Sequence, residues 1–306
     1  MNFAKTIEIT EVCPRDGWQN HPVLIPVERK IELIKKMMDC GPKVVEVTSF
    51  VNPKYVPQMA GAAEVVAGVA GYAEEKGVTM LALALNKRGV DSAREAGVKY
   101  VSFVVSASEE HNKRNANRTI EESMTEFKKL AEEAKDLRVA LAMPCVFGSP
   151  FGDEVPMDRV LAMCEAARSV GISEFGFADT AGISTPKNMR ERLQYLKKHM
   201  DLSEIGIHLH DTQGMGLANA YVALEEGVYK FDASLGAMGG CPFVPGAKGN
   251  IGTEDLLNMT LKMGLECEYD LDKAVALSLE MSSAIDAPVI SSVAALAAVK
   301  AGKNEK

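Results

Sequence analysis

The sequence predicts an α/β fold, a (β/α)8 TIM barrel with extra C-terminal helices, on three observations. Short apolar runs of strand type alternate with longer helical segments along most of the 306 residues. Eight such runs can be counted. Most are continuously apolar, which is typical of parallel strands covered on both faces. A doubly wound open sheet is the alternative, but it usually has fewer strands, and no GxGxxG motif follows the first strand here.

The eight predicted strands are short and carry mostly Val, Ile, Leu, Ala and aromatic residues. They cover residues 7–13, 44–49, 79–85, 100–106, 139–144, 174–179, 205–211 and 230–236. Because a helical segment separates each strand from the next, the strands are expected to be parallel and to form a TIM barrel.

The predicted helices fill the gaps between these strands. One follows Pro26 over residues 27–40 and stops before Gly41 and Pro42. Another begins at Thr119, where Glu122 three residues later completes a capping box, and runs to 137. The remaining six are expected over 57–76, 87–97, 156–170, 186–199, 214–226 and 253–264. Together these elements form a barrel over about residues 5–265.

The pattern changes after residue 265. Two further helices, 271–285 and 290–302, follow each other without a strand between them. We expect them to form a helical cap over about 266–302, within one domain of residues 1–306. Their apolar character predicts packing on the barrel or on a second subunit, which makes a homodimer the expected assembly.

Charge and composition exclude several functional classes. The net charge is −8 and no long basic stretch occurs, so nucleic acid is not an expected partner. The six cysteines form no CxxC pair, and no run of 18 apolar residues suggests a membrane span. The N-terminal residues lack the apolar core of a signal peptide. We therefore expect a cytoplasmic protein that acts on a small molecule.

Catalytic groups in a TIM barrel gather at the carboxyl ends of the strands, which gives a rule for selecting candidates. Polar residues stand at or just after the predicted ends of seven strands, and the eighth leads into a glycine-rich loop at 236–252 that contains Cys241. The candidates are Arg15, Asp16, Glu46, Thr48, Asn86, Ser106, Ser108, Cys145, Asp179, Thr180, His208, His210 and Asp211. This set is rich in metal ligands and ionisable groups.

The sharpest feature is the HLHD sequence. His208 and His210 share one face of a strand because side chains alternate, and two imidazoles on one side make half a metal site. Two histidines satisfied by core hydrogen bonds are the alternative. With a carboxylate such as Asp16, the set suits Mg²⁺, Mn²⁺ or Fe²⁺, whereas Cys241 as a third ligand would suit Zn²⁺. We favour Cys241 as an acid–base group that closes over the substrate.

Arg15 and Asp16 are adjacent and opposite in charge. Neighbours in a turn usually diverge, so we expect Arg15 to stabilise an oxyanion and Asp16 to bind metal. Glu46 lies in an apolar strand and needs a partner, for which Arg15 is the candidate. Asp179 is expected to be either a catalytic carboxylate or a turn residue.

Several motifs together resemble the 3-hydroxy-3-methylglutaryl-CoA lyase family. These are EVCPRDGWQN, VVEVTSFVNPKYVPQMA, FADTAGISTP, HLHDTQGMGLAN and GGCPFVPGAKGNIGTEDL, in the family's order over about residues 5–265. The resemblance implies a metal-dependent TIM barrel that cleaves a 3-hydroxyacyl-CoA into acetyl-CoA and a ketone or keto acid. Its divalent metal is expected to be Mg²⁺ or Mn²⁺.

The resemblance also implies roles for matching positions. Metal ligands would be Asp16, His208, His210 and Asn250; catalytic residues would be Arg15, Cys241, Glu46 and Asp179; substrate contacts are expected from Trp18, Gln19 and Thr180. Asp16 and Asp179 are both candidate general bases.

The chain differs from the residues usual in the family at three positions, Trp18, His21 and Pro22. These departures leave open a related lyase for another 3-hydroxyacyl-CoA, such as a citramalyl-CoA. A Claisen-condensing synthase of the isopropylmalate type and an inactive binding module are the further alternatives, and the retained catalytic set argues against the last.

Overall fold

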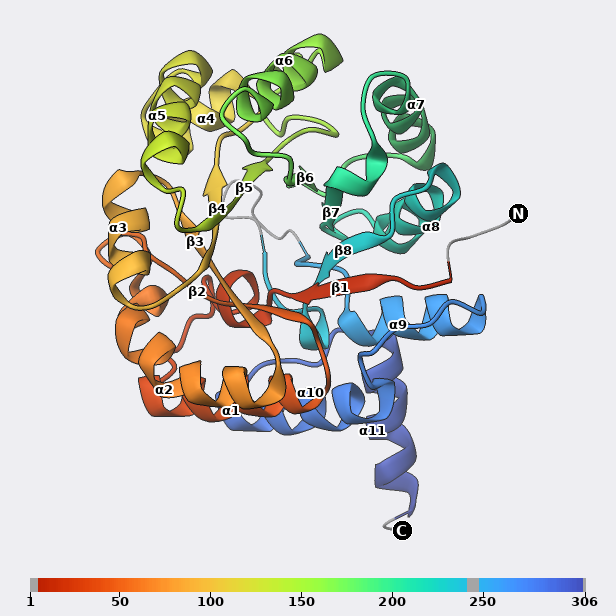
Figure 1. Ribbon diagram of the computed structural model, residues 1–306. Coiled ribbons are helices and arrows are strands. Elements are labelled where there is room, and N and C mark those ends of the chain that lie inside the picture. Colours follow the sequence, from red (N-terminus) through yellow and green to blue (C-terminus); the bar gives the residue numbers. More distant parts are fainter. Residues whose placement is uncertain (1–4, 241–247, 305–306) are drawn as a thin grey trace.

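The computed structural model describes residues 5–240 and 248–304 and shows a closed barrel of eight parallel strands (Figure 1). The strands follow one another around the barrel in chain order, and β1 pairs with β8 to close it. The predicted TIM barrel is therefore confirmed. The strands are β1 (Glu8–Glu11), β2 (Val44–Ser49), β3 (Thr79–Ala84), β4 (Tyr100–Val104), β5 (Arg138–Met143), β6 (Phe175–Asp179), β7 (Ile205–Leu209) and β8 (Lys230–Ala233).

Helices cover the outside of the barrel (Figure 1). They are α1 (Val27–Asp39), α2 (Ala62–Lys76), α3 (Lys87–Glu95), α4 (Glu109–Ala116), α5 (Ile120–Glu133), α6 (Met157–Arg168), α7 (Pro186–Lys197), α8 (Gly216–Glu226) and α9 (Thr253–Lys262). The core lies between the outward strand faces and the apolar helix faces, and in α1 Leu33, Ile34 and Met37 are fully buried. The predicted capping box of Thr119 and Glu122 is present at the start of α5.

Most predicted boundaries hold to within a few residues, and three differ for physical reasons. The first strand ends at Glu11, and residues Cys13–Gly17 form one π-helical turn. The helix expected over 57–76 is divided at Gly61, whose φ of 76° ends a short 3-10 turn before α2 begins. Helix α4 was not predicted, although Ser108 caps it by accepting a hydrogen bond from the backbone N–H of His111.

Two helices follow the barrel, α10 (Leu271–Ile285) and α11 (Ser292–Asn304), where two were expected. Helix α10 packs beside α1 and α9, and α11 extends away from the barrel (Figure 1). Within the described ranges, none of the helices combines the length and the apolar character that crossing a bilayer requires.

The buried carboxylate of Glu11 ties β1 to the C-terminal part of the chain. Its oxygens accept hydrogen bonds from the Tyr269 hydroxyl at 2.7 Å and from the Thr253 hydroxyl at 2.8 Å. The backbone N–H groups of Cys13 and Leu235 also donate to it, at 2.9 and 3.0 Å. Four donors on one buried acid fix the base of the turn that carries Arg15 and Asp16.

Candidate active site

The π-helical turn after β1 places two charged side chains at the mouth of the barrel. The N–H groups of Arg15, Asp16 and Gly17 all lie within hydrogen-bonding distance of the Val12 carbonyl, so the chain reverses tightly. Gly17 permits this turn to approach β8, because a Cβ at that position would stand 2.8 Å from the Ser234 hydroxyl oxygen. The turn therefore directs the side chains of Arg15 and Asp16 into the barrel, while its other residues Cys13, Pro14 and Gly17 are buried.

Arg15 is held from two sides. Its Nε donates to Glu46 Oε2 at 2.7 Å, which is the ion pair that the sequence predicted, and its Nη1 forms an ion pair with Asp16 Oδ1. The expectation that Arg15 and Asp16 diverge was wrong, because the π-helical turn brings the neighbouring side chains to the same side. Burial lowers the pKa of Arg15, but Glu46 and Asp16 outweigh this effect and raise it above its usual value.

Glu46 lies deep in the wall of the barrel and is 2% exposed. Burial raises its pKa to about 7, although Arg15 opposes the shift. A carboxyl group with this pKa can exchange a proton at neutral pH, which suits acid–base chemistry or the orientation of a neighbouring cation.

Asp16 divides its two carboxylate oxygens between different partners. Oδ1 faces Arg15 and accepts a hydrogen bond from Gln19 Nε2 at 3.1 Å. Oδ2 lies 3.5 Å from His210 Nε2 and 3.9 Å from His208 Nε2, and Asn250 Nδ2 donates to it at 2.8 Å. Burial alone would raise the pKa of Asp16, but Arg15 and the two histidines hold it well below its usual range. The group is therefore ionised and free to act as a ligand.

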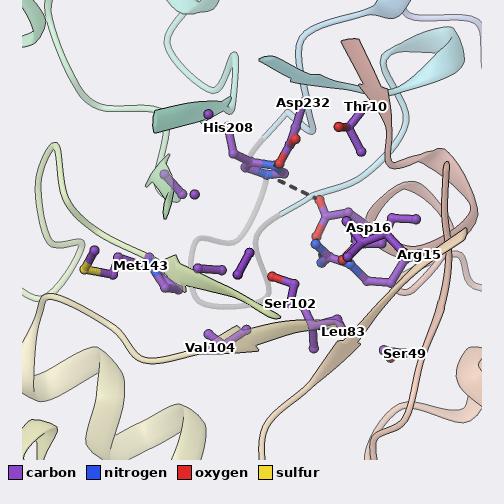
Figure 2. A pocket seen from close by; sticks show the side chains of 18 of the residues that line it. Thr10, Arg15, Asp16, Ser49, Leu83, Ser102, Val104, Met143, His208 and Asp232 are labelled. Atoms are coloured by element: carbon purple, nitrogen blue, oxygen red, sulfur yellow. Dashed lines mark hydrogen bonds and ion pairs between the residues drawn. The ribbon is translucent and has the colours of Figure 1, made fainter. Parts of the chain in front are cut away.

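Asp16, His208 and His210 form a cluster whose ligand atoms all lie within 4.8 Å of one another. Figure 2 shows His208 facing Asp16 across the site. Strand alternation places both histidines inward, as predicted, although β7 ends at Leu209 and His210 follows it in a single bridge to Asn250. That bridge brings Asn250 to the cluster from a distant part of the chain.

The donor atoms of this cluster fit a metal ion. His210 is 5% exposed, and its Nδ1 has no hydrogen-bond partner among the described residues, while its Nε2 faces Asp16 Oδ2 at 3.5 Å. Asn250 Oδ1 also has no hydrogen-bond partner among the described residues. Buried polar atoms without partners are costly unless something else satisfies them. Two imidazole nitrogens with carboxylate and amide oxygens suit a divalent cation of the Mg²⁺, Mn²⁺ or Fe²⁺ type.

Asp232 on β8 is a site residue that the sequence reasoning missed. Its Oδ2 lies 3.1 Å from His208 Nδ1, so it can fix the ring and its tautomer, with Nε2 toward Asp16. Burial lowers the pKa of His208, but Asp232 and then Asp16 raise it above its usual value. The sequence contained one signal for this role, because Asp232 ends the pattern Lys230-Phe231-Asp232 near the end of a strand.

A cavity of about 410 Å³ begins at this cluster and extends into the barrel. Arg15, Asp16, Glu46, His208 and His210 line it, together with the predicted substrate residues Gln19 and Thr180. Thr180 also accepts a hydrogen bond from the Cys145 backbone N–H at 3.0 Å. The volume lies in the range of small-molecule sites, roughly 300–1,000 Å³.

Two predicted residues lie elsewhere. Trp18 is fully buried behind the π-helical turn and does not line the cavity, so the expectation that it contacts substrate is corrected to a packing role. Asp179 is also buried outside the cavity, and its oxygens accept hydrogen bonds from the N–H groups of Ile183 and Ser184 at 3.1 and 3.0 Å. Asp179 therefore fixes the turn that carries Thr180. This is the role of turn residue that the sequence analysis gave as its alternative. Cys241 lies outside the described residues.

Comparison with known proteins agrees with this geometry. Residues 6–281 match the family model described as HMGL-like. The chain is 38% identical to hydroxymethylglutaryl-CoA lyase YngG of Bacillus subtilis, over 90% of this chain and 92% of that protein. It is 39% identical to the 3-hydroxy-3-isohexenylglutaryl-CoA/hydroxy-methylglutaryl-CoA lyase of Pseudomonas aeruginosa, over 89% and 91%.

A solved HMG-CoA lyase of Acinetobacter baumannii, in complex with coenzyme A and 3-methylmalate, superposes with a TM-score of 0.90. It is 32% identical, and the match covers 96% of each chain. A family model that spans most of the chain and a fold shared with a solved relative lead to one conclusion: the chain belongs to the HMGL-like family.

Proposed function

We propose that the protein is a divalent-metal-dependent carbon–carbon lyase that cleaves 3-hydroxy-3-methylglutaryl-CoA to acetyl-CoA and acetoacetate. The observation that carries the proposal is the cluster of Asp16, His208 and His210 beside Arg15 at the mouth of a closed barrel. Relatives known as hydroxymethylglutaryl-CoA lyases indicate the substrate, and the solved relative in complex with coenzyme A supports a thioester ligand.

The residues that would hold the cation are Asp16, His208, His210 and Asn250, and we propose Mg²⁺ or Mn²⁺. When bound, such an ion polarises the C3 hydroxyl group and orients the acyl group for cleavage. Asp16 suits this role because its low pKa keeps it ionised. Asp232 would keep the His208 ring in place.

Cleavage begins when the C3 hydroxyl passes its proton to a base, for which we propose Glu46, because it lines the cavity and has a pKa of about 7. The electron pair of the O–H bond forms the carbonyl of acetoacetate, and the pair of the C2–C3 bond forms the thioester enolate. Arg15 would donate hydrogen bonds to the enolate oxygen, since Nε and Nη1 are engaged and Nη2 has no partner among the described residues. Protonation of C2 completes acetyl-CoA, and Cys241 is our proposed donor.

The remaining cavity residues would position these groups. Glu46 holds Arg15, and its pKa of about 7 allows proton exchange at neutral pH. Gln19 supports Asp16, and Thr180 lines the wall beside the acyl group. This assignment moves the general-base role away from Asp16 and Asp179, because one is strongly acidic and the other is engaged in a turn.

We further propose a cytoplasmic homodimer. The five described cysteines are all free, which suits a reducing compartment. Helix α11 exposes Leu296 and Val299, with 56% and 55% of their surface accessible, and a second copy could cover them. A mass measurement in solution that finds only monomer would contradict the proposed dimer.

A thioester panel tests the proposed activity. Purified protein with Mg²⁺ or Mn²⁺ should release acetyl-CoA and acetoacetate in equal amounts from 3-hydroxy-3-methylglutaryl-CoA, and a chelator should stop the release. His208→Ala should lose activity, while His199→Ala, on the exposed segment after α7, should keep it. Absence of cleavage across a panel of 3-hydroxyacyl-CoA thioesters, with His208→Ala equal to the parent, would exclude the lyase.

A further inference from the structure

The interior of this barrel stays accessible to solvent. A TIM barrel is normally a packed core rather than a pore, because layers of bulky side chains fill it. Here the residues of β6, β7 and β8 alternate, so that those facing the helices are buried and those facing inward are partly exposed. On β7, Ile205 and Ile207 are fully buried, whereas Gly206 and His208 line the cavity and are partly exposed. The centre of the barrel therefore contains open space.

This space joins the active site to the opposite end of the barrel. Glu8, Arg138 and Lys230 are the first residues of β1, β5 and β8, and they line the same cavity as Asp16 and His208. Parallel strands all begin at one end of a barrel and all end at the other, so the cavity reaches both ends. We call its part below the Asp-His-His cluster the bore. Its lining includes Glu8, Thr10, Ser102, Gly176, Gly206 and Asp232.

Small residues keep the middle of the bore wide. Strand pairing places Ala142, Gly176 and Gly206 side by side in one row, which continues through Lys230 to Glu8. Neither glycine has a positive φ, and a Cβ built on either would meet its nearest neighbour at 3.7 or 3.8 Å, an ordinary contact distance. The backbone therefore does not require glycine at these positions, and the missing side chains leave the bore open.

Carboxylates stand at successive levels of the bore. Glu174 and Glu204 lie at the amino-terminal rim, Glu8 lies in the next row toward the mouth, and Asp232 lies in the row that holds His208. Figure 2 shows Asp232 beside His208 on the adjoining strand. Inward residues of one strand are two positions apart, so the rows follow one another at roughly 5 Å along the barrel axis. An ion that moves from the rim to the metal cluster therefore passes a carboxylate at every level.

The two acids at the rim are neutralised by arginines. Arg138 donates to Glu174 at 2.6 and 2.7 Å, and Arg168 forms an ion pair with Glu204. A carboxylate that is already paired attracts a further cation only weakly. The rim would therefore not retain an ion that enters there.

The two acids further in leave the bore negative. Lys230 is paired with Glu8 in strand register, but its Nζ donates to the backbone carbonyl of Ser203 at 2.7 Å, which directs the ammonium group to the rim. Within residues 5–240 and 248–304, neither Glu8 nor Asp232 forms an ion pair with a lysine or an arginine. A narrow passage lined by carboxylates raises the local concentration of cations and repels anions.

We infer that the bore is a second entrance to the metal site, through which a divalent cation reaches Asp16, His208 and His210 while coenzyme A fills the mouth. The inference rests on the proposed metal-dependent lyase. Coenzyme A is too large for a cavity of about 410 Å³, so the thioester arm must enter from the mouth and cover it. The bore then remains open to the ion from the amino-terminal end.

The kinetics of Mn²⁺ binding test this inference. Metal-free protein is mixed with Mn²⁺ in a stopped-flow instrument, with and without saturating coenzyme A, and a fluorescent indicator follows the free ion. In the parent protein, coenzyme A should lower the association rate by less than about threefold, because the bore stays open. In Gly206→Leu, coenzyme A should lower that rate by roughly tenfold or more, because the leucine fills the bore while coenzyme A covers the mouth.

The equilibrium separates a blocked entrance from a damaged site. A blocked route slows association and dissociation by the same factor and leaves the Kd for Mn²⁺ unchanged, since no contact of the bound ion is altered. Gly206→Leu should show this behaviour in the presence of coenzyme A. Gly71→Leu, on an exposed position of α2 with no atom within 4 Å of the new Cβ, is the matched control and should keep the parent rates.

A charge variant tests the bore without filling it, and it serves if Gly206→Leu folds poorly. Glu8 is exposed at the amino-terminal end, so a lysine there needs no new space. With coenzyme A present, Glu8→Lys should lower the Mn²⁺ association rate by roughly tenfold at low salt and by less at high salt. Glu75→Lys makes the same charge change on the exposed surface of α2 and should keep the parent rate.

The outcomes separate the entrance from the proposed lyase. If coenzyme A blocks Mn²⁺ entry in the parent as strongly as in Gly206→Leu, or if Gly206→Leu and Glu8→Lys keep the parent rates, the ion uses the mouth and the entrance is overturned, while the lyase stands. Slower association with unchanged dissociation in Gly206→Leu would show a damaged site and would also overturn the entrance. A parent protein that binds no Mn²⁺ would overturn the proposed metal site, and the entrance with it.

Discussion

His208 Nδ1 lies 3.1 Å from Asp232 Oδ2, so a carboxylate on β8 holds a ring on β7 whose other nitrogen faces Asp16. The two strands are neighbours in register, with His208 paired to Asp232. A carboxylate behind a ligating histidine fixes its tautomer and increases its basicity as a ligand.

Replacing Asp232 should therefore weaken metal binding without removing a ligand. We expect Asp232→Asn to lower the affinity for Mn²⁺ by about 10–100-fold, because the amide can accept the hydrogen bond but carries no charge. Titration of the purified variant with the metal alone measures this change. Asp272→Asn, exposed in the first turn of α10, is the control, and equal affinities in both variants would rule out the positioning role.

Removing a ligand should abolish stabilisation by the metal. Binding to the folded state alone raises the free energy of unfolding by about 2.7 kcal/mol when the metal is at 100 times its Kd. We expect this gain for the parent protein and for His199→Ala, and its loss in His210→Ala. Thermal unfolding with and without Mn²⁺ gives the comparison. A metal-dependent Tm shift that survives in His210→Ala would place the ion elsewhere.

Arg15 should matter for turnover more than for binding. Lysine keeps the charge but cannot contact Glu46 and Asp16 while also donating to a substrate oxygen. We expect Arg15→Lys to lower kcat by about 10²–10³-fold with a smaller change in KM, the size typical of a lost oxyanion donor. Arg29→Lys on the surface of α1 is the control, and a variant that changes KM alone would indicate a binding role.

The sequence predicted the barrel because its strands are continuous apolar runs of the right number and order. It predicted the inward pair His208 and His210 because side chains alternate along a strand. Asp232 was missed because the last strand was expected to reach residue 236, whereas it ends at Ala233 and makes Asp232 an end residue.

The contact between Arg15 and Asp16 could not be predicted from the sequence for a different reason. A π-helical turn has no sequence signature comparable to a capping box, and in this turn the adjacent side chains of Arg15 and Asp16 form an ion pair. The roles of Trp18 and Asp179 depended on burial, which separates residues that line a cavity from residues that support its wall.

The buried acid Glu11 should make stability depend on pH near neutrality. Burial raises its pKa from 4.5 to about 7, against four hydrogen bonds that lower it. Between these values the folded chain binds more protons than the unfolded chain, so the free energy of unfolding falls as the pH rises. The contribution is complete below about pH 4.5, is lost above about pH 7, and amounts to roughly 3 kcal/mol.

Glu11→Gln isolates this contribution, because glutamine stays neutral and its amide can donate to the Tyr269 oxygen that now donates to Glu11. Relative to the parent, the variant should gain about 3 kcal/mol across this window, as measured by urea unfolding at a series of pH values. Glu8→Gln lies on the same strand but is exposed, and it should show no such relative gain. Parallel pH profiles for the parent and Glu11→Gln would mean that Glu11 is ionised throughout, with its four donors outweighing its burial.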